Sequence, residues 1–121
     1  MYQFSFISLV IITITELNNK LNTLTVTGMK QIMTSYGFQI SHQKVGCIHI
    51  LRIAGNPNGN VTTHNITLPA EASCQNFYSA PVRVGNYWGN VSIDPSNRMC
   101  SIKMDGSVPA SLYFCIWCVY I

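Results

Sequence analysis

The pair of residues whose spacing most resembles a chemical motif is Cys115 and Cys118. Two cysteines separated by two residues are typical of redox-active and zinc-binding sites. A strand is predicted at this position, however, and residues three apart in a strand point to opposite faces. No second cysteine pair or histidine cluster in the sequence completes a zinc site. We therefore interpret both residues as packed thiols and predict no metal site and no cofactor.

The four acidic residues and three histidines do not form a recognisable catalytic set. Glycoside hydrolysis requires two carboxyl groups that face one bond, whereas Asp94 and Asp105 both lie in turn signals, where such side chains normally cap backbone groups. His49 lies in a predicted strand and is interpreted as a packed or interface histidine rather than a base. No serine or cysteine has a nucleophile setting such as Gly-x-Ser-x-Gly. The sequence therefore predicts no catalytic residues and no enzyme activity.

The candidate ligand-binding residues lie around an aromatic pair, Tyr87 and Trp88, which two glycines flank. Aromatic ring faces next to glycines can stack on sugar rings, and Asn86 and Asn90 can supply hydrogen bonds. The alternative, which we favour from the sequence, places Trp88 in the core and makes Tyr87 an interface anchor. The candidate ligand-binding residues are therefore Tyr87, Trp88, Asn86 and Asn90.

Charged residues are scarce in this chain. They make up 9% of the sequence, while 48% is hydrophobic, and an ordinary soluble domain has about 25% charged residues. Disorder is excluded because it requires low hydrophobicity and high charge. Either the strand surfaces are coated with Ser, Thr and Asn, or much of the surface is buried in an obligate oligomer. The seven Lys and Arg are scattered singly, so the net charge of +3 does not indicate nucleic-acid binding.

The five cysteines are an odd number without regular spacing, which argues against a disulfide framework. Buried free thiols fit a protein assembled in a reducing cytosol.

The apolar run at residues 6–14 resembles the core of a signal peptide, but no Lys or Arg precedes it and no small-residue cleavage site follows it. It is also shorter than the roughly 20 apolar residues that cross a bilayer, so no membrane insertion is expected. Glycosylation sequons begin at Asn60, Asn65 and Asn90, a number close to that expected by chance.

Residues 1–36 and residues 37–121 have different sequence patterns. Apolar residues at positions 7, 10, 14, 17, 21 and 24 have the spacing of heptad a and d positions, over about two and a half heptads. We interpret residues 1–36 as a short oligomerising stalk or helix. An amphipathic helix packed on its own domain, a strand, and the remnant of a longer shaft are the alternatives. Residues 37–121 alternate short apolar runs with turn signals, which predicts an all-β head domain, an antiparallel β-sandwich resembling a jelly roll.

Within this head the last predicted strand is the most informative. The predicted strands are 43–53, 61–68, 79–84, 88–93, 99–104 and 112–121, with turns at 55–60, 85–86, 94–97 and 105–107. In 112–121 both faces are apolar, with Phe114 and Ile116 on one face, and Trp117 and Val119 on the other. A strand that is apolar on both faces must be covered on both. One face is therefore expected to meet the opposing sheet, and the other a neighbouring subunit or the N-terminal segment.

Five short motifs follow one another in the second part of the chain. They are Val45-Gly-Cys-Ile-His-Ile-Leu-Arg-Ile53, Asn65-Ile-Thr-Leu-Pro-Ala70, Val91-Ser-Ile-Asp94, Ile102-Lys-Met-Asp-Gly106 and the terminal Val119-Tyr-Ile121. In this order they resemble the C-terminal β-sandwich heads of tailed-bacteriophage tail fibre, baseplate and receptor-binding proteins. The resemblance covers residues 37–121, and residues 18–24 also resemble the coiled linkers that precede such heads.

The resemblance implies a non-enzymatic virion structural protein that is made in the cytoplasm of a bacterial host. It implies a homotrimer that contacts other virion tail proteins, with the head binding a saccharide or protein on the host surface. The cysteine content and the apolar N-terminus depart from the family pattern. The alternative is a secreted carbohydrate-binding β-sandwich module, which would require a cleaved N-terminus and oxidised cysteines.

Overall fold

The computed structural model of the chain describes residues 28–121, so the predicted stalk over residues 1–27 lies outside the described part. The described part contains eight β-strands and one turn of 3-10 helix. In chain order these are β1 (Lys30–Ser35), β2 (Phe38–Val45), β3 (Ile48–Gly55), β4 (Val61–Thr67), η1 (Ala70–Ala72), β5 (Tyr78–Val84), β6 (Tyr87–Ile93), β7 (Met99–Val108) and β8 (Phe114–Tyr120).

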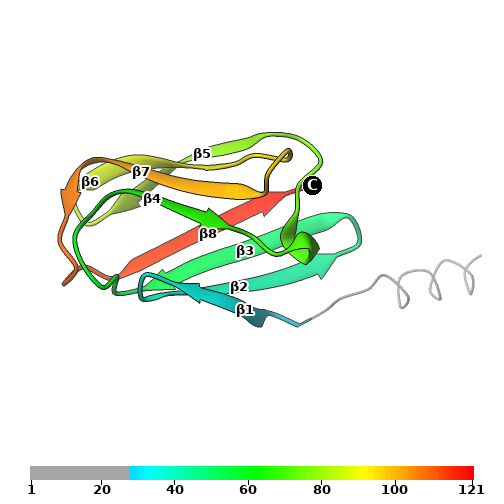
Figure 1. Cartoon of the computed structure of the whole chain (residues 1–121), viewed down its shortest axis with the longest axis horizontal. Coiled ribbons are helices and arrows are strands. Elements are labelled where there is room, and N and C mark those ends of the chain that lie inside the picture. Colours follow the sequence, from blue (N-terminus) through cyan, green and yellow to red (C-terminus); the bar gives the residue numbers. More distant parts are fainter. Residues whose placement is uncertain (1–27) are drawn as a thin grey trace, which may run out of the picture.

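The strands form two antiparallel four-stranded sheets that pack face to face (Figure 1). The first sheet has the strand order β1-β2-β3-β8 and the second has the order β4-β7-β6-β5. This arrangement confirms the predicted all-β sandwich. The second sheet is a Greek key, because β5, β6 and β7 are joined by hairpins and β4 lies beside β7. The first sheet is a meander extended by β8, so the resemblance to a jelly roll, which has two Greek keys, is limited.

The core lies between the two inner sheet faces, where apolar side chains alternate with outward-facing polar ones. Phe38 and Phe114 are fully buried and meet edge to face, with ring centroids 5.1 Å apart. Ten further large side chains are also buried almost completely. These are Ile40, Leu51, Ile53, Val61, Ile66, Leu68, Val91, Ile93, Ile102 and Val108.

In the final strand, β8, successive side chains point to opposite faces of the sheet, as predicted. Its inner side chains are buried, while Cys115, Trp117 and Val119 are exposed in the single chain. Cys115 and Cys118 lie on opposite faces, as expected for residues three apart in a strand. All five cysteines are free thiols, and three of them are buried. The partner expected on the outer face of β8 stays a prediction.

In the first sheet, two boundaries in the structure differ from those predicted from the sequence. The predicted strand 43–53 is a hairpin, because β2 ends at Val45 and β3 begins at Ile48. Gly46 permits this turn, since its φ of 61° lies in the left-handed region that glycine adopts without strain. In addition, β1 falls within the segment 1–36 and pairs with β2. The sheet therefore includes residues that precede position 37.

A third difference concerns Asp105-Gly-Ser107, which was predicted as a turn but lies inside β7. Val61 of β4 pairs with Val108, whereas Thr63 pairs with Lys103. The extra residues of β7 are accommodated as a bulge, which bends a strand without ending it. The turn-forming residues therefore mark an irregularity in the strand rather than a hairpin.

Candidate functional site

The outer face of the second sheet is polar and carries one large exposed aromatic side chain, Trp88 on β6. Alternation places Asn90 on the same outer face, and the strand register brings Arg83 of β5 and Lys103 of β7 beside these residues. We call this surface the Trp88 face. Its residues are Ser79, Arg83, Trp88, Asn90, Lys103 and Asp105. Neighbouring outward residues on β4 and β7 include Thr63, Asn65, Thr67 and Ser101.

Both neighbouring strands contact Trp88, β5 at its indole ring and β7 at its backbone. The guanidinium carbon of Arg83 lies 5.1 Å from the ring centroid, a cation–π distance. Arg83 is itself oriented, because its Nε–H donates to the carbonyl oxygen of Gly85 at 2.9 Å. The backbone N–H of Trp88 donates to Oδ1 of Asp105 at 3.3 Å. The ring is thus oriented while 54% of the residue stays accessible to solvent.

Neutral hydrogen-bonding groups lie next to the ring. The side-chain amide of Asn90 donates to Oγ of Ser79 at 2.9 Å. Asn90 also pairs across the sheet with Lys103, whose ammonium group adds a positive charge beside the amide. Because side chains on one face of a strand recur about every 7 Å, the amide lies about one sugar ring away from the indole. The face therefore combines an apolar ring with amide, hydroxyl and ammonium groups.

The four candidate residues do not all lie together. Trp88 and Asn90 share the outer face, while Tyr87 points inward and packs against the core. Asn86 is exposed in the turn between β5 and β6. The favoured sequence interpretation, with Trp88 in the core, is therefore wrong. Sequence reasoning also missed four residues of the Trp88 face, because they join it only through the strand register. These are Ser79, Arg83, Lys103 and Asp105.

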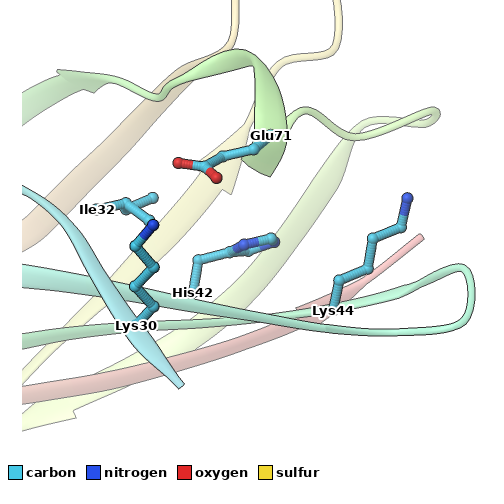
Figure 2. A pocket seen from close by; sticks show the side chains of 5 residues that line it. All are labelled: Lys30, Ile32, His42, Lys44 and Glu71. Atoms are coloured by element: carbon cyan, nitrogen blue, oxygen red, sulfur yellow. The ribbon is translucent and has the colours of Figure 1, made fainter. Parts of the chain in front are cut away.

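A second polar region lies at the end of the first sheet, beside η1 (Figure 2). Here a cavity of about 300 Å³ is lined by Lys30, Ile32, His42, Lys44 and Glu71. Glu71 belongs to η1 and extends over the cavity toward the side chains of the sheet. The cavity thus carries charges of both signs at the boundary between sheet and helix.

Beneath this cavity two histidines form a buried pair. Nε2 of His42 and Nδ1 of His49 lie 2.8 Å apart, and both residues are more than nine-tenths buried. The ring of His49 stacks on Tyr120 with centroids 5.0 Å apart and planes 4° apart. The hydroxyl of Tyr120 donates to the carbonyl oxygen of Ala72 at 2.6 Å. These contacts join β2, β3, β8 and η1, which makes the histidines structural, as predicted for His49.

The histidine pair predicts a loss of stability in acid. Burial is the main effect that lowers the pKa of His42, His49 and His64 below 6.5. Nearby Lys44 adds to this for His42 and His49, while Glu71 opposes it for His42. The unfolded chain therefore binds more protons between pH 6.5 and the lower folded-state values, so stability falls as pH falls through this window. Protonating both members of the pair would also place two N–H groups against each other.

We expect the free energy of unfolding, measured by urea denaturation, to be constant above about pH 7 and to decrease steadily from about pH 6.5 toward pH 5. The double variant His42→Gln/His49→Gln should show a much shallower decrease. A variant with the same pH dependence as the wild type would contradict this assignment.

Asp94 and Asp105 both have structural partners. Oδ1 of Asp94 accepts hydrogen bonds from the backbone N–H of Ser96 at 2.9 Å and from its hydroxyl at 2.7 Å. These bonds lower the pKa of Asp94 and fit the predicted turn role. Asp105 accepts a hydrogen bond from the backbone N–H of Trp88.

Among residues 28–121 no group of three or more His, Cys, Asp or Glu residues is arranged to hold a metal ion. No helix in the same part of the chain has the length and apolar character needed to cross a membrane.

Comparison with known proteins adds no relative. No family model matches the chain, and neither the curated proteins nor the solved structures include a significant match. The functional argument therefore depends on the chain's own residues and geometry.

Proposed function

We propose that this chain is a non-catalytic recognition head that binds a saccharide through the Trp88 face. The observation that carries the proposal is the exposed indole of Trp88, which Arg83 orients next to the amide of Asn90. The C–H groups of a sugar ring pack on an aromatic face, and amide and hydroxyl groups bind sugar hydroxyls. An open sheet face suits a chain of sugars on a surface, whereas small molecules bind in concave pockets.

The composition of the face favours a saccharide over a protein partner. The centres of protein interfaces are depleted in charged residues and enriched in aromatic ones. The Trp88 face has one aromatic ring surrounded by Ser, Thr and Asn side chains, with Arg83 and Lys103 near the carboxylate of Asp105. This mixture of neutral donors, acceptors and a small cationic excess suits a neutral or weakly acidic polysaccharide.

We further propose that the head belongs to a bacteriophage tail fibre or baseplate and binds the host surface. The support is the ordered set of motifs from Val45 to Ile121, together with five free thiols that suit assembly in a reducing cytosol. A secreted carbohydrate-binding module is the second candidate, favoured by the exposed sequon residues Asn60 and Asn65. Both candidates use the same saccharide face.

The binding proposal is tested by replacing Trp88 with alanine. Aromatic residues at the centre of a binding site commonly contribute about 2 kcal/mol or more, which corresponds to roughly 30-fold in affinity. We expect Trp88→Ala to lose at least that much affinity for the host's envelope polysaccharide, measured by calorimetry with purified polysaccharide. The matched control is Phe77→Ala, which removes another exposed aromatic ring outside the Trp88 face. Equal binding by both variants would refute the proposal.

The setting of the protein is tested by mass spectrometry of the intact chain from its native source. A phage protein is expected to retain its N-terminus and five reduced thiols, and its peptides should be found in purified particles. Cleavage near residue 20 together with disulfide bonds would instead support the secreted module. Neither result depends on the binding measurement.

A further inference from the structure

The two sheets have four edge strands, and three of these are modified in ways that hinder pairing with another chain (Figure 1). The register of β1 with β2 shifts between Gln31 and Met33, and that of β4 with β7 shifts between Val61 and Thr63, opposite the bulge in β7. The third edge strand, β5, has Pro81 at its centre. Bulges and prolines are the usual protection of an exposed edge, because an unpaired row of N–H and C=O groups otherwise recruits another strand.

The fourth edge strand, β8, has none of these features. Its register with β3 is continuous, from Phe114 opposite Gly55 to Tyr120 opposite His49. Its sequence contains no proline, glycine or charged residue. Toward its end β8 has partners in the chain. The N–H of Gln75 donates to the carbonyl oxygen of Ile121 at 2.9 Å, the backbone N–H of Val119 donates to the hydroxyl of Tyr78, and β5 lies against β8. The first part of β8 is therefore an unprotected edge.

The outer face beside this edge is also apolar. Trp117, Val119 and Ile121 are each at least half exposed, and Ile48 on β3 is 41% exposed. Arg52 is the one charged residue among them, and its guanidinium carbon lies 5.7 Å from the centroid of the Trp117 ring. Exposed apolar residues gathered on one edge of a sheet indicate an interaction surface.

We propose that β8 pairs antiparallel with β8 of a second copy of this chain, so that the two first sheets become one continuous sheet. A strand without charges can pair with itself without repulsion, and a two-fold contact is self-complementary because each copy offers the same surface. An axis that passes through a residue keeps the faces matched, and the axes at Ile116 and at Trp117 lie near the middle of β8. Both bring Trp117 against an outer-face residue of the partner strand, and such cross-strand aromatic contacts stabilise a sheet.

This pairing has a geometric consequence. The axis relating two antiparallel strands of one sheet is perpendicular to that sheet, so both sandwiches present the same side in the same direction. The Trp88 face lies on the other sheet of each sandwich, on the side that points away from the first sheet, and both copies of it then face one way. Two sites facing one surface bind it with an avidity 10²- to 10⁴-fold above that of one site. This consequence depends on the proposed saccharide function, but the dimer does not.

The dimer is tested by sedimentation of the full chain at about 10 μM, where a complex of micromolar affinity or tighter is populated. We expect twice the chain mass of 13.5 kDa. Trp117→Lys should give a monomer with an unchanged circular dichroism spectrum, because lysine blocks pairing at an edge. Met29→Lys is the matched control, since it changes an exposed apolar residue beside the opposite edge strand and should leave the dimer intact.

Cross-linking provides a second test that needs no change in Trp117. In a Cys47→Ser background, Cys115 is the exposed thiol, and either register places the two Cys115 residues within about 15 Å. A bismaleimide of that reach should produce a covalent dimer, and Cys115→Ser should abolish it.

A monomeric wild type would overturn the edge pairing, and so would the homotrimer that the resemblance to phage heads implies. A monomer in which Cys115 resists alkylation would show instead that residues 1–27 cover this edge. Saccharide binding by a monomer would leave the proposed function intact, so the two proposals fail separately.

Discussion

Replacing Phe114 with alanine is expected to lower the melting temperature of this protein by roughly 15–30 °C. Phe114 is fully buried where β8 begins, and its ring meets that of Phe38 edge to face between the sheets. A buried Phe→Ala change costs about 3–5 kcal/mol, which combines the lost burial and the cavity left behind. Since a domain of this size is stable by about 5–15 kcal/mol in total, the loss is a large part of the whole.

The measurement is thermal unfolding followed by circular dichroism. The control is Phe77→Ala, because Phe77 is 63% exposed and its truncation should change stability by no more than about 0.5 kcal/mol. Similar melting temperatures for the two variants would contradict the packing described for the core.

The second large effect is expected at Gly89, between Trp88 and Asn90 on β6. A side chain here would collide with the backbone carbonyl oxygen of Lys103 and come within 2.6 Å of Sδ of Met104. Gly89 pairs directly with Met104, so relief requires β6 and β7 to move apart. We expect Gly89→Ala to lose about 3 kcal/mol or more of stability, at the upper end of overpacking effects. It should also weaken saccharide binding, because the strand that carries Trp88 is displaced.

Gly106→Ala is a matched control on the adjacent strand. Its Cβ would come no nearer than 3.5 Å to the ring of Tyr87, an ordinary contact distance. This variant should therefore stay within about 1 kcal/mol of the wild type in urea denaturation. If the two alanine variants unfold at the same urea concentration, the close approach at Gly89 is not the cause.

The sandwich could be predicted from the sequence where alternation and turn chemistry agreed. In β8, an apolar run that follows a turn signal predicted the strand, and the two-residue period of a strand predicted the separation of Cys115 from Cys118. The hairpin at Gly46 was missed because apolar, β-branched residues continue through it and only one glycine marks the turn. The bulge in β7 was mistaken for a turn because the same residue types favour both structures.

The candidate site was predictable only in part. The alternation that separated the two cysteines also separates Tyr87 from Trp88, so their opposite orientations could have been derived from the sequence. The contact of Arg83 with the Trp88 ring could not be derived from the sequence, because it follows from the pairing of β5 with β6. The buried pair of His42 and His49 likewise depends on the β2–β3 hairpin, which brings the two rings together from positions seven residues apart.

The position of β8 beside β3 also affects how the protein folds. The hairpins from β1 to β3 and from β5 to β7 are local and can form early. The pairing of β3 with β8, in contrast, joins Gly55 to Phe114 and requires a long loop to close first. Such long-range strand pairings place a domain among those that fold in milliseconds to seconds rather than microseconds. Until β8 arrives, β3 is itself an open edge with an apolar inner face. An intermediate that lacks β8 is therefore the species most prone to aggregate.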